Sequence, residues 1–182
     1  DDGNESTGVT GKFVYNGTND VKMDSLSLGG QDTLDFSARN AKLALDAANL
    51  KSDAHSLLNW DVKETTVTGT GENFKGQMNL VDVEAKTSGS TLNMVSQAFD
   101  AMFGQGKGKL NLGAKGTTDP QVRNILNVTG GELNLTNSSD ETGSLVSGEG
   151  LIIANSGITL GAKYSGKTEL QTAGKLSVGD ND

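Results

Sequence analysis

Short apolar runs, separated by turn residues, recur along most of the chain. The pattern is clearest between Gly148 and Val178, where four apolar runs are each followed by Gly, Asn or Ser. Apolar and polar positions mostly alternate, which is typical of a half-buried strand because successive side chains of a strand point to opposite faces. The runs recur about every seven to ten residues, an interval too short for a helix between strands. The pattern predicts a coil of β-structure that keeps turning in one direction.

The same alternation predicts short strands before Gly148. Glycine and asparagine close most of them, and glycine supplies the positive φ that many turns need. Threonine is frequent in several of these segments, where its branched Cβ packs well on a pleated surface. The predicted strands lie at residues 13–15, 21–23, 26–28, 34–36, 60–62, 66–68, 78–83, 92–94, 109–112, 127–128, 132–135 and 144–146.

Residues 38–60 fit two structures. Leu43, Leu50 and Leu57 have helical spacing, and several alanines raise the helix propensity of the segment. Leu43 and Leu45 also alternate as in a strand, and the flanking segments both predict strands. The sequence alone does not decide whether this segment is a strand or a helix of several turns.

Two other segments predict short helices inserted between strands. In residues 91–104, apolar side chains recur at i, i+3, i+6 and i+7, a threonine or serine can cap the start, and Gly104 stands at the C-cap. For residues 120–126, Asp119 and Pro120 form a good pair for the N-cap and the first helical position. We expect the amphipathic helix at 91–104 to cover the core and not to bind a ligand.

One phrase recurs in the predicted strands, a glycine followed by an apolar, polar, apolar sequence. Three strands in each turn would give a rung whose length is in the low-to-mid twenties of residues, the scale of a parallel β-helix. We therefore expect residues 1–182 to form a single all-β segment of a parallel β-helix with one or two short helical insertions, excerpted from a longer protein. The phrase occurs at residues 108–112, 131–135, 157–160 and 174–178.

The composition favours a thin, elongated core. Hydrophobic residues make up 34% of the chain and aromatic residues 4%, and small side chains can stack in rows that are only one or two across. Glycine occurs 25 times and proline once, which suits turns between strands whose backbone N–H groups are all needed. The chain has no cysteine, so disulfides and thiolate metal sites are excluded.

The charge and hydropathy of the chain narrow the classes of partner. A net charge of −8 argues against nucleic acid and against anionic membrane surfaces, because both need a cationic face. No run of about 18 apolar residues occurs, so we expect no membrane-spanning segment.

The chain offers little for catalysis. His55 is the only histidine, so a triad or a histidine-rich metal site would have to be built on this one residue. Paired carboxylates could serve a β-helix enzyme, but few aromatic residues are present as platforms for sugar rings. We expect solvated turn residues here and no catalytic residue, cofactor or metal. The carboxylates considered are Asp46, Asp53, Asp61, Asp140, Glu141, Asp180 and Asp182.

Polar side chains of Asn, Thr, Ser, Lys and Asp project from the predicted strands in rows. Two such faces in contact could form many hydrogen bonds and charge pairs, each of them weak. This contact is the mechanism we expect for adhesion or self-association, although the pattern does not fix the register that would locate the binding face. Sequons for N-glycosylation, expected by chance in so polar a chain, stand at Asn4, Asn16, Asn127, Asn134 and Asn137.

The phrases VTGTGENFKGQMNLVDVEAKTSGSTLNM, NVTGGELNLTNSS and AGKLSVGD resemble the passenger domains of Gram-negative autotransporters, especially adhesins. The resemblance covers most of the chain from about Val62 onward. It implies a right-handed β-helix at the cell surface or secreted from it, whose exterior faces mediate adhesion, self-association or biofilm formation. The implied partner is a host surface, a matrix component or another copy of the chain.

Two alternatives stay open. The segment GKGKLNLGAKGTTDPQVRNILNVTGGELNL, with a predicted strand, short helix and strand, is similar to repeats of AsmA-like lipid-transport proteins. That similarity implies a periplasmic protein with an apolar groove. The other alternative is a β-helix polysaccharide lyase or hydrolase, which would need two carboxylates that converge in a cleft.

Overall fold

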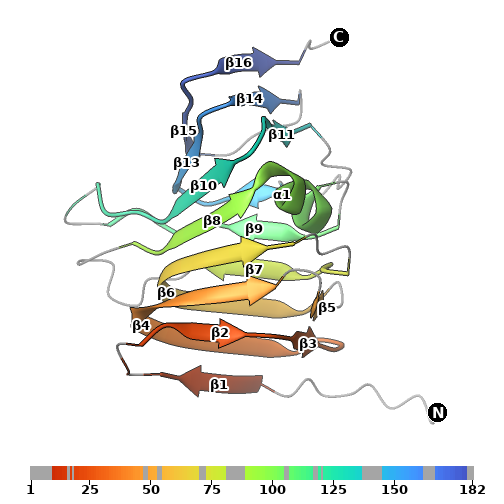
Figure 1. Cartoon of the computed structure of the whole chain (residues 1–182), viewed down its shortest axis with the longest axis vertical. Coiled ribbons are helices and arrows are strands. Elements are labelled where there is room, and N and C mark those ends of the chain that lie inside the picture. Colours follow the sequence, from red (N-terminus) through yellow and green to blue (C-terminus); the bar gives the residue numbers. More distant parts are fainter. Residues whose placement is uncertain are drawn as a thin grey trace.

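The computed structural model shows a mostly β-stranded chain, with one short helix in its described part. The strands run across the long axis of the molecule and stack along it (Figure 1). Every pairing between the described strands is parallel. The predicted all-β class is therefore confirmed. The described residues are 10–15, 17, 19–46, 49–52, 55–69, 73–80, 89–104, 107–116, 119, 121–136, 145–161 and 167–179.

Most strands are short, as the sequence predicts, but β4 and β6 are 14 and 12 residues long. The elements are β1 (Thr10–Val14), β2 (Val21–Met23), β3 (Leu26–Leu28), β4 (Thr33–Asp46), β5 (Leu50–Ser52), β6 (Leu57–Thr68), β7 (Gln77–Leu80), β8 (Thr91–Val95), α1 (Ser96–Phe103), β9 (Lys109–Asn111), β10 (Ile125–Thr129), β11 (Leu133–Leu135), β12 (Val146–Ser147), β13 (Leu151–Ala154), β14 (Gly157–Leu160), β15 (Glu169–Gln171) and β16 (Lys175–Val178).

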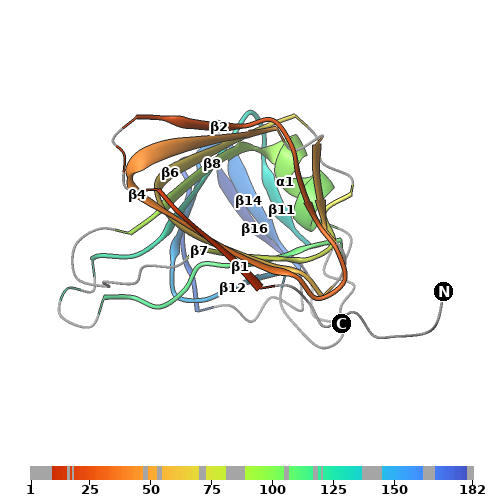
Figure 2. The same cartoon turned by 90° about the horizontal axis from the view of Figure 1, so that it is seen from below.

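The strands fall into three stacks, which we call walls. The first wall contains β1, the first halves of β4 and β6, β7, β9 and β12. The second contains β2, the second halves of β4 and β6, β8, β10, β13 and β15. Because β4 and β6 bend from one wall into the other, these two walls form one curled sheet. The third wall contains β3 with β5, and β11 with β14 and β16, and the three walls border an interior (Figure 2).

The chain passes the walls in a fixed order, and we call one such passage a circuit. Thr10 pairs with Thr33, Thr33 with Leu57, and Leu57 with Gln77, so these circuits take 23, 24 and 20 residues. They lie close to the predicted turn length. The next circuit is longer, since Gln77 pairs with Lys109 and α1 lies between them in the sequence.

Apolar side chains fill the interior in columns, with one member from each circuit. The rings of Phe36 and Trp60 are neighbours in the first wall and pack edge to face, with centroids 5.0 Å apart. Full burial of a large apolar side chain stabilises the fold by about 1.5–3 kcal/mol, so a column only one residue wide is still a substantial core. The longest fully buried column of the first wall is Leu58, Met78, Leu110 and Val146.

The segment for which the sequence allowed a helix, residues 38–60, forms strands over most of its described residues. β4 continues to Asp46, β5 follows, and β6 begins at Leu57. Leu43 is buried and lies in register between neighbours on β2 and β6. The helix alternative is wrong because only an extended chain can pair with strands on both sides.

The helix predicted at 91–104 is confirmed only in its second half. Residues 91–95 form β8, which is extended because it pairs with β6 on one side and β10 on the other. α1 follows the second wall directly, and Gly104 is its C-cap as predicted. No helix in the described part of the chain has the length and apolarity that crossing a membrane requires. The side chains that α1 buries are Ala98, Phe99, Met102 and Phe103.

The helix predicted at 120–126 is wrong over the described residues. Asp119 Oδ1 accepts a hydrogen bond from the Gln121 N–H (2.9 Å), and Asp119 O accepts one from the Val122 N–H (3.1 Å). These bonds close a single turn, after which β10 begins at Ile125 and pairs with β8 and β13. Pairing on both sides holds this segment extended, so Asp119 closes a turn and does not cap a helix.

Candidate functional site

The outer side of the first wall carries one polar side chain in each of four successive circuits. We call Asp35, Asn59, Asn79 and Asn111 the first polar row. Each pairs in register with the next, Asp35 with Asn59, Asn59 with Asn79, and Asn79 with Asn111. All four side chains are half-buried, while their neighbours along each strand turn into the core. The row therefore runs along the long axis of the molecule.

Side-chain hydrogen bonds connect the first three members of the first polar row. Asn59 Nδ2 donates to Asp35 Oδ1 (2.6 Å), and Asn79 Nδ2 donates to Asn59 Oδ1. Gln77 Nε2 donates to Asn79 Oδ1 (2.6 Å). Asn111 Oδ1 accepts a backbone N–H two residues further along the chain (2.9 Å). These bonds fix the orientation of each amide, so the row is a rigid line of polar groups.

The second wall carries a similar line on its outer side, which we call the second polar row. Lys42 Nζ lies 3.2 Å from Glu64 Oε2, and Asn93 Nδ2 donates to Glu64 Oε1 (2.9 Å). Asn127 Nδ2 in turn donates to Asn93 Oδ1 (2.9 Å). One end of the second polar row is the ion pair of Lys42 and Glu64, whereas the corresponding end of the first polar row is the carboxylate of Asp35.

A shorter third polar row lies on the outer side of β11, β14 and β16. Asn134 pairs in register with Thr159, and Thr159 pairs with Ser177. The Thr159 hydroxyl donates to Glu132 Oε1. All three walls therefore present hydrogen-bonding side chains to the outside in successive circuits.

The chemistry of these rows suits binding. A side-chain amide carries two N–H donors and two acceptor lone pairs on its oxygen, and the bond to the next member of a row uses one donor. Adjacent strands lie about 4.8 Å apart, so a row repeats its donors and acceptors at that spacing. Amides do not titrate, and they serve neither as nucleophiles nor as general bases. The rows can hold a polar partner with a repeated hydrogen-bonding pattern.

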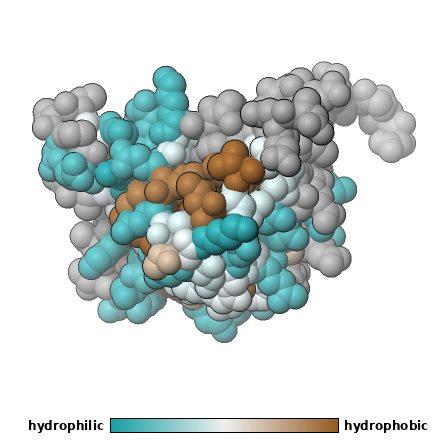
Figure 3. Space-filling model, turned by 90° about the horizontal axis from the view of Figure 1, so that it is seen from above, coloured by the Kyte–Doolittle hydropathy of each residue, from teal (hydrophilic) through white to brown (hydrophobic). Residues whose placement is uncertain are grey.

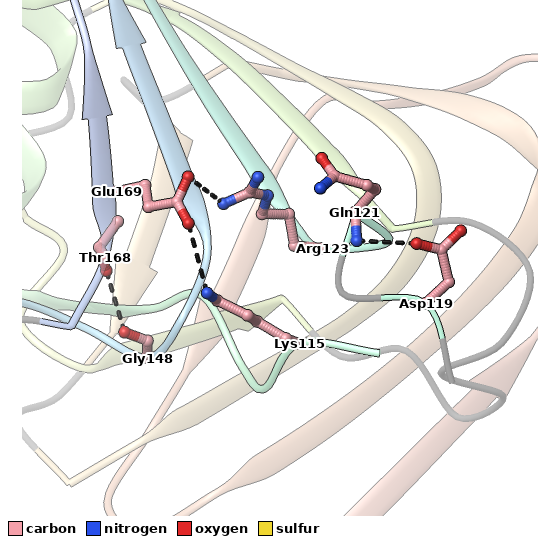
Figure 4. A network of polar contacts seen from close by, with 7 residues as sticks. All are labelled: Lys115, Asp119, Gln121, Arg123, Gly148, Thr168 and Glu169. Carbon is pink, nitrogen blue, oxygen red and sulfur yellow. Dashed lines mark hydrogen bonds and ion pairs between the residues drawn. The ribbon is translucent and has the colours of Figure 1, made fainter. Parts of the chain in front are cut away.

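A charged cluster lies where the chain passes from the first wall to the second, close to β15, which is near the top of the molecule in Figure 1. Figure 4 shows the cluster from close by. Glu169, at the start of β15, lies between two cations. Its Oε2 is 2.6 Å from Arg123 Nη1, and its Oε1 is 3.3 Å from Lys115 Nζ. Hydrogen bonds from Arg123, and then from Lys115, lower the pKa of Glu169 below 4.5. The carboxylate stays ionised and tied to its partners, an arrangement that stabilises the fold.

Asn124, next to Arg123 in the chain, is the most connected buried polar side chain of this region. Only 2% of its surface is exposed. Its Oδ1 accepts the Ser90 N–H (2.7 Å), and its Nδ2 donates to Leu80 O (2.8 Å) and Leu112 O (2.9 Å). Leu80 is the last residue of β7, Ser90 directly precedes β8, and Leu112 directly follows β9. Asn124 therefore joins two circuits at the corner between the first two walls.

The structure does not gather the residues that the sequence offered for catalysis. His55 is an exposed turn residue. Asp61 is buried in β6 beside Ser37 of β4, whereas Asp46 pairs with Thr68 at the far end of the second wall. No cluster of three metal-ligating side chains occurs within the described ranges. Outside the described residues lie Asp53, Asp140, Glu141, Asp180 and Asp182, and the sequons at Asn4, Asn16 and Asn137.

The sequence contained a signal for the polar rows. A bulky apolar residue, an asparagine and a second bulky apolar residue follow one another at six places. Both apolar neighbours are buried in each case, and the asparagine between them faces outward. Two of the sequon asparagines, Asn127 and Asn134, are members of rows. The tripeptides are residues 58–60, 78–80, 92–94, 110–112, 126–128 and 133–135.

Comparison with known proteins identifies no relative of this chain. No family model, curated protein or solved structure matches it.

Proposed function

We propose that this chain is a right-handed parallel β-helix that acts as a non-catalytic, adhesin-type association module. The parallel pairings in three walls and the early circuits of 20 to 24 residues support the β-helix. Crossovers between parallel strands are right-handed in about 98% of cases, which supports the handedness. The resemblance of the sequence to autotransporter adhesins supports a location at the surface of a Gram-negative bacterium.

The observation that carries the proposed function is the first polar row. Its amides are held in one orientation by the bonds between Asp35, Asn59 and Asn79. Preorganised groups lose little conformational entropy on binding, so contacts that are weak one by one can add up to useful affinity. Association through this row needs no catalytic group and no cofactor.

Another copy of the chain is the partner that the row fits best. Two copies of the row have the same spacing of about 4.8 Å between circuits. Amides both donate and accept, so a row can pair with itself across a twofold axis. In the cell this contact would join modules on neighbouring bacteria, which is cell–cell adhesion.

Sedimentation of the purified chain over a range of concentrations tests the proposal. Asn79→Arg places a long cation in the middle of the row, and two facing rows would then bring like charges together. We expect at least about a tenfold weaker dimer, equivalent to about 1.4 kcal/mol. Gln97→Arg is the matched control, because it also introduces an arginine, at an exposed residue of α1 that belongs to none of the polar rows. It should associate like the wild type.

Three results would count against this proposal. A wild-type chain that stays monomeric at the highest concentration would exclude self-association. Equal weakening by Asn79→Arg and Gln97→Arg would show that the first polar row is not the contact. A monomeric chain that binds surfaces coated with matrix protein, and loses that binding with Asn79→Arg, would keep the row as the site and replace the partner.

A further inference from the structure

The third wall is broken in its middle, whereas the described strands of the other two walls form one continuous sheet. Its lower piece is the pair β3 and β5, and its upper piece contains β11, β14 and β16. Phe74 extends the lower piece by a single bridge to Ser52 of β5. β11 is an edge strand, which pairs with β14 above it and with no described strand below it.

The break is one circuit high. β6 pairs with both β7 and β8, and these two strands pair in turn with β9 and β10. The circuit that contains β7, β8 and α1 therefore lies between the circuit of Phe74 and the circuit of β11. Adjacent strands of a sheet lie about 4.8 Å apart, so a regular wall would hold one strand between Phe74 and β11.

The helix α1 takes the place of this missing strand. The ring of Phe103, the last residue of α1, packs edge to face on Phe74, with centroids 5.7 Å apart. Ser96, the first residue of α1, lies against Gly131, where an added Cβ would be 3.4 Å from the Ser96 Cβ. The helix thus reaches across the break from Phe74 to the chain just before β11.

Apolar side chains attach α1 to the walls, and no strand ladder does. The helix has eight residues, and helices of this length are marginal on their own. Its N-cap, Val95, makes no side-chain cap bond, and neither its first nor its last turn carries a charge that complements the helix dipole. A competitor that offers apolar side chains and backbone hydrogen bonds together can therefore replace α1.

An extended segment has both properties. Its backbone can pair with the open edge of β11, as in other cases of strand addition. Seen from above, apolar surface gathers over the interior, with hydrophilic residues around it (Figure 3). On β11, Leu133 and Leu135 are buried and Asn134 between them is exposed. A segment that continues these columns needs an apolar, polar, apolar sequence.

We propose that α1 is a lid over the break in the third wall, and that one extended segment of a partner protein, apolar and polar in alternation, binds there when the lid opens. Circuits border the break above and below, so a single strand fits and a folded sheet does not. The closed lid blocks the edge, which is a common way to protect an edge strand. Binding of the segment shifts the population towards the open state.

A disulfide that locks α1 shut tests this proposal, because the chain has no cysteine of its own. The separation of 3.4 Å between the Cβ positions at residues 96 and 131 suits a disulfide, in which it is roughly 3.5–4.5 Å. The double variant Ser96→Cys with Gly131→Cys is compared in its oxidised and reduced forms. Mass spectrometry verifies the bond, and circular dichroism verifies the fold.

The probe is a fluorescent peptide with the sequence of residues 130–136, Gly-Gly-Glu-Leu-Asn-Leu-Thr, which has the pattern of β11 itself. Fluorescence polarisation measures its binding. We expect the oxidised form to bind at least about tenfold more weakly than the reduced form, because only an open lid exposes the edge. A peptide with aspartate in place of both leucines should bind to neither form. Hydrogen exchange should slow in β11 when the first peptide binds.

A second variant loosens the lid. Phe103→Ala removes the contact between α1 and Phe74, so the open state becomes more populated and the peptide should bind at least about tenfold more tightly than to the wild type. Phe36→Ala is the matched control, since it removes an equally buried ring from the first wall, away from α1. It should leave peptide binding unchanged.

The outcomes separate this proposal from self-association through the first polar row. Equal binding by the oxidised and reduced forms would overturn the lid. Equal gains with Phe103→Ala and Phe36→Ala would show that the peptide binds any loosened chain. Folded variants that bind no peptide at all would overturn the extended segment as the occupant. Asn79→Arg should leave peptide binding unchanged, so either proposal can fail without the other.

Discussion

The lower and upper parts of the molecule turn the same corner by different means. In the lower part, β4 and β6 run from the first wall into the second without a break. A register shift between Ala38 and Lys42 of β4 accommodates the bend, since these residues pair with Val62 and Glu64 of β6. In the upper part β7, β9 and β12 stop at the corner, and the strands that follow it in the second wall, β8, β10 and β13, have only four or five residues.

At the upper corner no strand continues from the first wall into the second, and glycines and buried hydrogen bonds hold the chain there instead. Gly148 has a φ of +96°, and a Cβ there would lie 2.7 Å from backbone atoms of Gly113. Asn124 supplies hydrogen bonds that the interrupted strands do not make at this point. One corner therefore depends on backbone pairing and apolar columns, and the other on individual side chains. This difference predicts which substitutions each part tolerates.

The largest effect should come from Trp60→Ala in the lower part. Trp60 is fully buried against Phe36, and removing its ring leaves a cavity in the column. We expect a loss of about 3–5 kcal/mol in the free energy of unfolding. Urea denaturation followed by circular dichroism measures it.

Trp60→Phe is the control for this experiment. It keeps an aromatic ring beside Phe36 and removes an Nε1–H that has no hydrogen-bond partner among the described residues. Its loss should be clearly smaller. Equal losses for the two variants would mean that filling the column is not what stabilises the lower part.

A smaller effect should follow from Asn124→Ala in the upper part. The substitution leaves the Ser90 N–H and two carbonyl oxygens without their partner in a buried corner, which costs about 1–3 kcal/mol. Hydrogen exchange should show faster opening of β8 and β10, with β4 and β6 still protected. Asn127→Ala, in a half-buried row position, is the comparison and should cost less. Uniform loss of protection over the whole chain would contradict the division into two parts.

The smallest effect should be the pH dependence added by Glu169. Its pKa is lowered in the folded state, so its contribution to stability is present above pH 4.5 and is lost as the pH falls through the lowered folded value. Glu169→Gln should lower the thermal midpoint slightly at neutral pH, and the difference from wild type should vanish in acid. A difference that persists or grows in acid would show that Glu169 acts in some other way.

The strands could be predicted from sequence because alternation reports a local property, the burial of every second side chain. The helix at 120–126 could not be excluded, since Asp119 and Pro120 are as suitable for a turn as for a helix start, and only pairing of β10 on both sides decides between them. The polar rows needed the register, which the pattern of one strand does not contain. The asparagine tripeptides were visible, but their alignment across circuits was not.

The direction of the strands also decides how the molecule would respond to a pulling force. All described strands run across the long axis, and the hydrogen bonds between circuits point along it (Figure 1). Tension applied to the two ends would open these bonds one circuit after another, instead of loading them all together. Each early circuit of 20 to 24 residues would release roughly 70–80 Å of extended chain. A chain built this way would lengthen stepwise under load.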